Sequence, residues 1–152
     1  MIAVVQRVTE GAVNVGEETV GSIGPGLLAL VAVCADDTPQ DAEWMARKLV
    51  GLRIFRNGDK HFDADVKQAG GSILLVSNFT VAAATRKGRR PSFEAAADAQ
   101  KGAELFAALV EAVRGSGVPV ETGRFRADMR VQLVNDGPVT VILNSAQARG
   151  GK

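Results

Sequence analysis

An unbroken apolar segment, residues 27–34, constrains the fold of this chain more than any other feature. It follows the turn-forming sequence Gly24-Pro25-Gly26 and reads Leu-Leu-Ala-Leu-Val-Ala-Val-Cys. A strand with one face in water alternates apolar and polar residues, whereas a strand without polar residues is covered on both faces. The segment therefore predicts a strand at the centre of a sheet. Even when it is extended to Ala35, it is far too short to cross a membrane as a helix.

Other segments have the pattern of strands around this central one. Residues 3–9 and 12–15 alternate, or nearly alternate, apolar and polar side chains, and Gly11 and Gly16 punctuate them. We expect these two segments to open the fold as a β-meander. A second buried strand and three closing strands are predicted from composition at residues 72–80, 118–122, 129–135 and 139–144.

Two segments carry helix signals. Thr38 is a typical N-cap before Pro39, and Gly51 marks the end of this first helix. The second helix has an apolar stripe and ends near Gly115. The order of elements predicts an α+β fold, with a curved, mainly antiparallel sheet or barrel-like core and two packed helices, as a single domain over residues 1–152. The small, polar tail from residue 146 to residue 152 is expected to fray.

The chain is poor in acid–base side chains, with one histidine, one cysteine and no tyrosine. A serine-type triad needs a base beside its nucleophile, and only His61 fits that role. His61 follows a turn beside Asp63 and Asp65, so an exposed loop histidine competes with a weak cation site or acid–base role. Cys34 has no second cysteine with which to form a disulfide or a zinc motif, and it is most simply a buried apolar residue. We therefore expect no metal and no cofactor.

Charge is nearly balanced, with 18 Lys+Arg against 17 Asp+Glu, so attraction for a polyanion has to come from local clusters. One cluster contains Arg86, Lys87, Arg89 and Arg90, with a glycine between the two pairs. It is either a clamp for backbone phosphates or a solvated basic loop. Residues 1–8 lack a basic region followed by a long apolar stretch, which predicts a cytoplasmic protein without a membrane segment.

The end of the second buried strand is the first place to look for chemistry. Ser77, Asn78, Phe79 and Thr80 place hydroxyl groups there, which could present a nucleophile or orient an ester. The neighbouring main-chain amides could stabilise an oxyanion. Ordinary strand residues remain the simpler interpretation from sequence, because no base lies nearby along the chain.

Two further segments have a functional and a structural interpretation. Gly137-Pro138 lies within residues 135–140, whose Asn, Asp, Gly and Pro residues are typical of a hairpin turn. Phe125 and Met129 are four residues apart, so an aromatic ring and a thioether could sandwich a purine base. Core packing is the simpler interpretation of this pair.

Taken together, five segments resemble the bacterial and eukaryotic D-aminoacyl-tRNA deacylase family in content and order. The resemblance runs almost end to end, and two of the segments are active-site signatures of the family. The five segments are residues 3–8, 23–28, 77–81, 85–93 and 135–140.

The resemblance implies a homodimeric ester hydrolase that removes D-amino acids from tRNA, and glycine mischarged on tRNA-Ala, without a membrane or DNA partner. The Gly137-Pro138 step of one subunit, in the cis form, would enter the pocket of the other and reject L-amino acids. Arg7 would brace this chirality filter. The strand-end segment would form the catalytic wall, the aromatic–thioether pair would hold the terminal adenine, and the basic cluster would contact the tRNA. The resemblance also implies that the 2′-hydroxyl of the terminal adenosine assists catalysis.

The sequence departs from the family pattern at several positions. Asn78 replaces a common glutamine, Val81 replaces leucine, and residues 82–84 are plainer than usual. Arg126 stands beside the implied adenine pocket where glycine is usual, and glycine adopts conformations that arginine adopts less easily. Two other functions stay open at this point: a noncatalytic tRNA-binding dimer, and a related deacylase with a trans Gly-Pro step that tolerates a small L residue.

Overall fold

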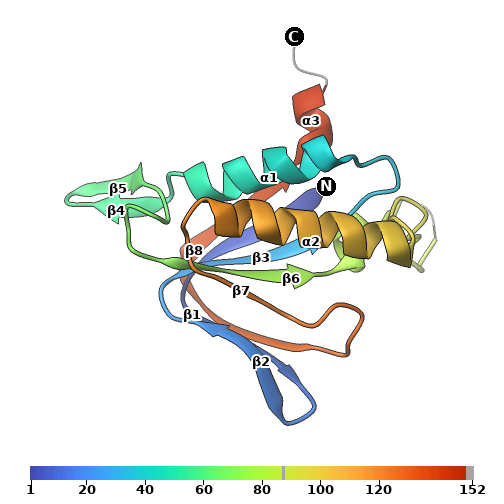
Figure 1. The fold of residues 1–152 in the computed structure, drawn as a ribbon, viewed down its shortest axis with the longest axis horizontal. Coiled ribbons are helices and arrows are strands. Elements are labelled where there is room, and N and C mark those ends of the chain that lie inside the picture. The colour runs from blue at the N-terminus through green and yellow to red at the C-terminus, as the bar shows by residue number, and fades with distance from the viewer. Residues whose placement is uncertain (87, 150–152) are drawn as a thin grey trace.

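Strand β3 (Gly26–Ala32) lies at the centre of the main sheet in the computed structural model, which describes residues 1–86 and 88–149 (Figure 1). Leu27, Ala29 and Val31 belong to the larger core cluster, whereas Leu28 belongs to a second cluster on the opposite face. The expectation of a central strand buried on both faces is therefore confirmed.

The main sheet has the order β2-β1-β3-β6-β7, and β8 also pairs with β1. Its pairing is mixed: β3–β6 and β6–β7 are parallel, and the pairs made by β1 are antiparallel. A small hairpin of β4 and β5 stands apart from it, with a turn at Gly58 and Asp59 between its strands. The strands are β1 (Ile2–Val15), β2 (Glu18–Ile23), β4 (Phe55–Asn57), β5 (Lys60–Ala64), β6 (Ser72–Ser77), β7 (Val120–Thr122) and β8 (Arg130–Asn144).

The sheet curls until β2 comes close to β7, which nearly closes a barrel. Gly21 lies at this seam, and a Cβ atom on it would stand 2.4 Å from the carbonyl oxygen of Thr122. Only a residue without a side chain permits this approach of the two backbones. The curved, barrel-like core expected from the sequence is therefore present, with a glycine where its two ends meet.

Helices α1 (Pro39–Gly51) and α2 (Ala99–Gly115) lie side by side over one face of the sheet (Figure 1). The Asp41 carboxylate accepts hydrogen bonds from the backbone N–H and the hydroxyl of Thr38, both at 2.9 Å, which caps α1 where the sequence predicted. Asp98 caps α2 by accepting a hydrogen bond from the Lys101 N–H at 2.9 Å. Apolar residues of both helices complete the larger core cluster, including Met45, Leu49, Leu105, Leu109 and Val113.

Several boundaries differ from the sequence prediction. Residues 3–15 form one continuous strand rather than two, because β1 runs through Gly11 with partners on both sides. The second buried strand ends at Ser77, and a short 3-10 helix η1 (Phe79–Ala82) follows it. Part of the tail expected to fray forms helix α3 (Ser145–Arg149), while residues 150–152 lie outside the described part of the chain.

No helix in the described ranges is both long enough and apolar enough to cross a membrane.

Candidate active site

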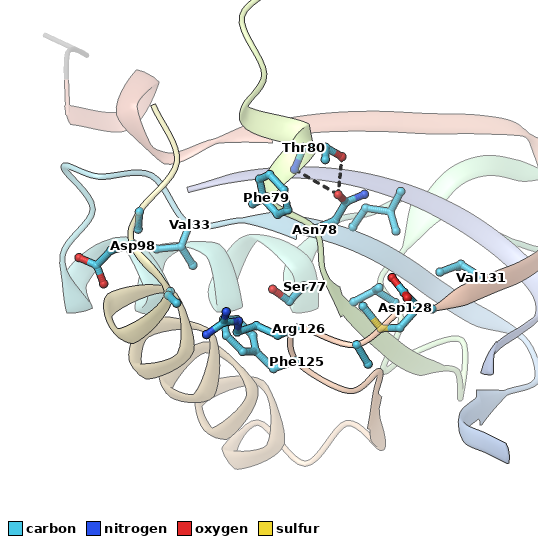
Figure 2. Close-up of a pocket in the computed structure, with 17 residues that line it drawn as sticks. Val33, Ser77, Asn78, Phe79, Thr80, Asp98, Phe125, Arg126, Asp128 and Val131 are labelled. Carbon is cyan, nitrogen blue, oxygen red and sulfur yellow. Dashed lines mark hydrogen bonds between the residues drawn. The ribbon is translucent and has the colours of Figure 1, made fainter. Parts of the chain in front are cut away.

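A pocket of about 710 Å³ opens where β6 ends, a size suited to a small ligand (Figure 2). It is bounded by the end of β3, the β6–η1 junction, the start of α2 and the loop before β8. The sequence-predicted residues that line it are Ser77, Asn78, Phe79, Thr80, Phe125 and Met129. The structure thus brings two segments that are far apart in the chain into one cavity.

Asn78 organises the β6–η1 junction. Its side-chain oxygen accepts hydrogen bonds from the Thr80 hydroxyl at 2.5 Å and the Thr80 N–H at 3.2 Å (Figure 2). The Asn78 N–H donates to the Val31 carbonyl at 2.8 Å, which ties the junction to the central strand. Within the described residues, the Phe79 N–H has no acceptor. The junction therefore offers one free backbone donor, while the Thr80 hydroxyl proton is already engaged.

The opposite wall is apolar. The Phe125 ring packs near Phe106, with ring centroids 6.4 Å apart, and its edge lies over Gly102 at the first turns of α2. Met129 packs against the second core cluster. Both side chains are partly buried and also face the pocket, so packing and ligand contact are compatible roles.

Sequence reasoning missed part of the lining. Asp98 and Asp128, which the sequence did not point to, contribute carboxylates. Arg126, noted beside the implied adenine pocket, contributes a guanidinium, and these three are the ionisable side chains among the described lining residues. Figure 2 shows Phe125 and Arg126 on the α2 side of the pocket and Asp128 on its far side. The N-cap character of Asp98 was readable, but its distance along the chain from Ser77 concealed that both face one cavity.

The basic cluster begins directly after the pocket wall. Arg86, Arg89 and Arg90 are exposed, while Lys87 lies outside the described residues. Two backbone hydrogen bonds between Ala84 and Ser92, at 2.8 and 2.9 Å, close the loop that carries them. The ring of Phe93 packs edge-on against Phe79 with centroids 5.2 Å apart. The loop is thus anchored to the pocket wall, although its arginines are not among the lining residues.

Residues 136–139 form an excursion within β8 rather than the hairpin turn that composition favours. Strand β8 pairs with β1 on both sides of it, since Thr140 pairs with Gln6 and Asn135 with Val8. The chain therefore does not reverse here. The segment is a bulge within a continuous antiparallel strand pair, and bulges are over-represented beside active sites.

Arg7 holds this excursion from within the sheet. Its buried guanidinium donates to the Asp136 carbonyl at 2.9 Å and the Ile54 carbonyl at 2.6 Å, and it pairs with the Asp136 carboxylate at 3.0 Å. Asn135 adds bonds from its side-chain nitrogen to the Arg7 and Val139 carbonyls, both at 3.0 Å. These contacts fix both ends of the excursion.

The Gly137–Pro138 peptide bond is cis, and both residues are exposed. Neither residue lines the pocket of the same chain, and Arg7 does not line it either. The structure therefore gathers six predicted site residues in one cavity and leaves the Gly-Pro step at a separate surface.

His61 lies in strand β5 of the small hairpin, is exposed, and is not a lining residue of the pocket. Cys34 is partly buried and forms an isolated bridge with Ala96. The described residues contain no cluster of three or more His, Cys, Asp or Glu side chains that could hold a metal ion. A serine-type triad built on His61 has no geometric basis in this pocket.

The D-Tyr-tRNA(Tyr) deacylase family model matches residues 4–144. A D-aminoacyl-tRNA deacylase of Thermotoga petrophila is 52% identical over 147 residues, which cover 97% of this chain and 99% of that protein. One from Geobacter sulfurreducens is 50% identical over 145 residues, 95% of each chain. Among solved structures, one described as a c-Myc DNA unwinding element binding protein matches 95% of this chain and 98% of its own, at 36% identity and a TM-score of 0.90. Another, described as a probable eukaryotic D-amino acid tRNA deacylase, has the same fold at 17% identity and a TM-score of 0.79, covering 93% and 97%.

Fold, pocket and relatives place the chain in the class of hydrolases that act on aminoacyl esters of tRNA. Within that class it belongs to the D-aminoacyl-tRNA deacylase family, as the five sequence segments indicated.

Proposed function

We propose that this protein hydrolyses the ester bond of D-aminoacyl-tRNA and releases a free D-amino acid and tRNA. In this member of the family, one pocket combines an apolar wall, formed by Phe125 and Met129, with the polar residues at the end of β6. This observation carries the proposal. The terminal adenine would lie between Phe125 and Met129, and the ester would face Ser77 and Thr80. The exposed arginines of the adjoining loop would contact backbone phosphates without reading sequence.

Catalysis would rest on the backbone and the substrate. Water adds to the ester carbonyl, the Phe79 N–H stabilises the oxyanion, and the C–O bond to the terminal ribose breaks as its 3′-oxygen takes a proton. The 2′-hydroxyl of the terminal adenosine would assist this proton transfer. The chain has one histidine and no tyrosine, and its histidine does not line the pocket, which supports such a route.

Selection against L-amino acids would require a second copy of the chain. Gly137 and Pro138 project from the sheet on an excursion held by Arg7, away from the pocket of their own chain. In a homodimer they would enter the partner's pocket and exclude an L side chain by backbone contacts alone. Glycine has no side chain to exclude, so glycyl-tRNA mischarged on tRNA-Ala would also be hydrolysed. We place this activity in the cytoplasm, where aminoacyl-tRNA is used, without a membrane or DNA partner.

Thr80→Ala is expected to keep kcat within about tenfold of the wild type, as expected for loss of one neutral hydrogen bond. The Thr80 hydroxyl donates its proton to the Asn78 amide oxygen, which is not a base, so it is unsuited to act as a nucleophile. Steady-state hydrolysis of D-aminoacyl-tRNA measures the effect. Complete loss of activity, with folding and tRNA binding intact, would instead assign the threonine as the nucleophile.

The function itself is tested by comparing hydrolysis of D-, L- and glycyl-tRNA by the dimeric protein. We expect release of D-amino acids and glycine and no release of L-amino acids. Equal hydrolysis of L and D esters would exclude the filter. Binding of tRNA without release of any amino acid would favour the noncatalytic tRNA-binding dimer, and tighter binding of single-stranded DNA than of tRNA would contradict the proposed partner.

A further inference from the structure

Arg126 has an uncommon backbone conformation. Its φ of 61° lies in the left-handed region, and the other described residues with positive φ are glycines. An L side chain in this region costs on the order of 1–2 kcal/mol. Local packing does not explain the residue, because Arg126 is exposed. Strained positions of this kind cluster at ligand-binding sites, where an added interaction offsets the cost.

Figure 2 shows the Arg126 side chain at the α2 side of the pocket. Arg126 is a lining residue, next to Phe125 and two positions before Asp128. In the described part of the chain the guanidinium of Arg126 forms no hydrogen bond or ion pair, whereas that of the nearby Arg124 pairs with Glu18 at 2.9 Å. Of the two lining carboxylates, Asp98 is engaged in capping α2, and Asp128 lies on the far side of the pocket from Arg126 (Figure 2). The pocket therefore contains a cation whose donors are all available to a ligand.

We propose that Arg126 binds the phosphate of the 3′-terminal nucleotide of the substrate RNA. The inference rests on the proposed function, in which the base of that nucleotide lies between Phe125 and Met129. Arg126 follows Phe125 directly and lines the same pocket as Phe125 and Met129, so we place the phosphate of that nucleotide beside its guanidinium. A planar guanidinium can donate two parallel hydrogen bonds to phosphate oxygens, which fixes orientation as well as adding affinity.

Adenosine 5′-monophosphate and adenosine differ by this phosphate and make a direct probe. We expect the wild-type protein to bind the monophosphate on the order of tenfold more tightly, the lower range for hydrogen bonds to a charged group. Arg126→Asn and Arg126→Gly remove the guanidinium with residues that tolerate positive φ. Both variants are expected to lose the preference and keep adenosine affinity, whereas Arg126→Lys keeps part of it. Chemical-shift titration of the dimeric protein measures the affinities.

Salt dependence gives a second readout that a merely structural role would not change. We expect both Arg126 variants to lose one phosphate contact to a single strand. This loss reduces the magnitude of the slope of log affinity for tRNA against log salt by about 0.7. The proposal is overturned if the wild type binds both compounds equally or binds neither. It is also overturned if both variants keep the preference for the monophosphate, or if their affinity for adenosine falls as far as their affinity for the monophosphate. Hydrolysis of D-aminoacyl-tRNA by the wild type is measured alongside. Turnover without a monophosphate preference would leave the proposed function standing and remove only the role of Arg126.

Discussion

Alanine at position 137 is expected to lower kcat/KM for D-aminoacyl-tRNA by about a hundredfold, the cost of misplacing a substrate-positioning group by about 1 Å. A Cβ atom on Gly137 would stand 1.9 Å from the backbone nitrogen of Val139 and 3.1 Å from the side-chain oxygen of Asn135. Because the first contact is with backbone, the excursion has to change shape. Residues 136–138 are exposed, so the rest of the sheet is expected to stay folded. Steady-state hydrolysis and thermal unfolding measure the two effects.

Gly24→Ala is the matched control. Gly24 also precedes a proline, but a Cβ atom on it would meet nothing within 4 Å. We expect this variant to keep wild-type activity and stability. Equal loss of activity in both variants would show that Gly137 has no special role, and wild-type kinetics for Gly137→Ala would remove the Gly-Pro step from the selection mechanism.

Arg7→Ala is expected to lower the free energy of unfolding by about 2 kcal/mol, because the buried Ile54 carbonyl loses its charged donor. For a chain of this size that corresponds to a fall in Tm of about 6 °C. The Asp136 carbonyl is released at the same time, so the excursion becomes mobile and deacylation falls further than the loss of folded protein accounts for. Calorimetry and kinetics well below Tm separate these two effects.

Two controls accompany this variant. Arg7→Lys keeps one charged donor and is expected to retain part of both stability and activity. Arg53→Ala removes an exposed arginine that pairs with the Asp63 carboxylate and donates to the Asp63 carbonyl, and we expect a loss of about 1 kcal/mol or less. If Arg7→Ala were as stable and as active as Arg53→Ala, the network around Asp136 would not support the site.

The local parts of the fold could be predicted because their signals lie within short segments. The apolar residues of the central strand, the Thr38-Pro39 helix start and the apolar stripe of α2 each depend on neighbours a few positions away. Pairing across the chain could not be predicted in the same way. The parallel contact of β3 with β6, and the continuity of β1 through Gly11, depend on partners that a local pattern does not identify.

The site shows the same division. Ser77 and Phe125 were identified as candidates, but only the fold shows that they face one pocket. Composition favoured a hairpin turn at Gly137-Pro138. The prediction was wrong because Asn, Asp, Gly and Pro occur in bulges within a continuous strand pair as well as in chain reversals. The family resemblance carried the functional interpretation of that step. Asp98 went unrecognised as a lining residue, since its helix-capping role explains its residue type completely.

The arrangement of β1 also has a consequence for how the protein is made. This first strand pairs with β8, and its register joins Ile2 to Asn144. A nascent chain on the ribosome therefore cannot complete its sheet until almost the whole sequence has been synthesised, at about 5–20 residues per second. During that interval, the apolar strands β3 and β6 have been synthesised, but β1 still lacks its partner β8. We expect biogenesis to depend on chaperones that shield the unfinished sheet, and refolding from denaturant to be slow for a chain of this length because its contacts are so distant in sequence.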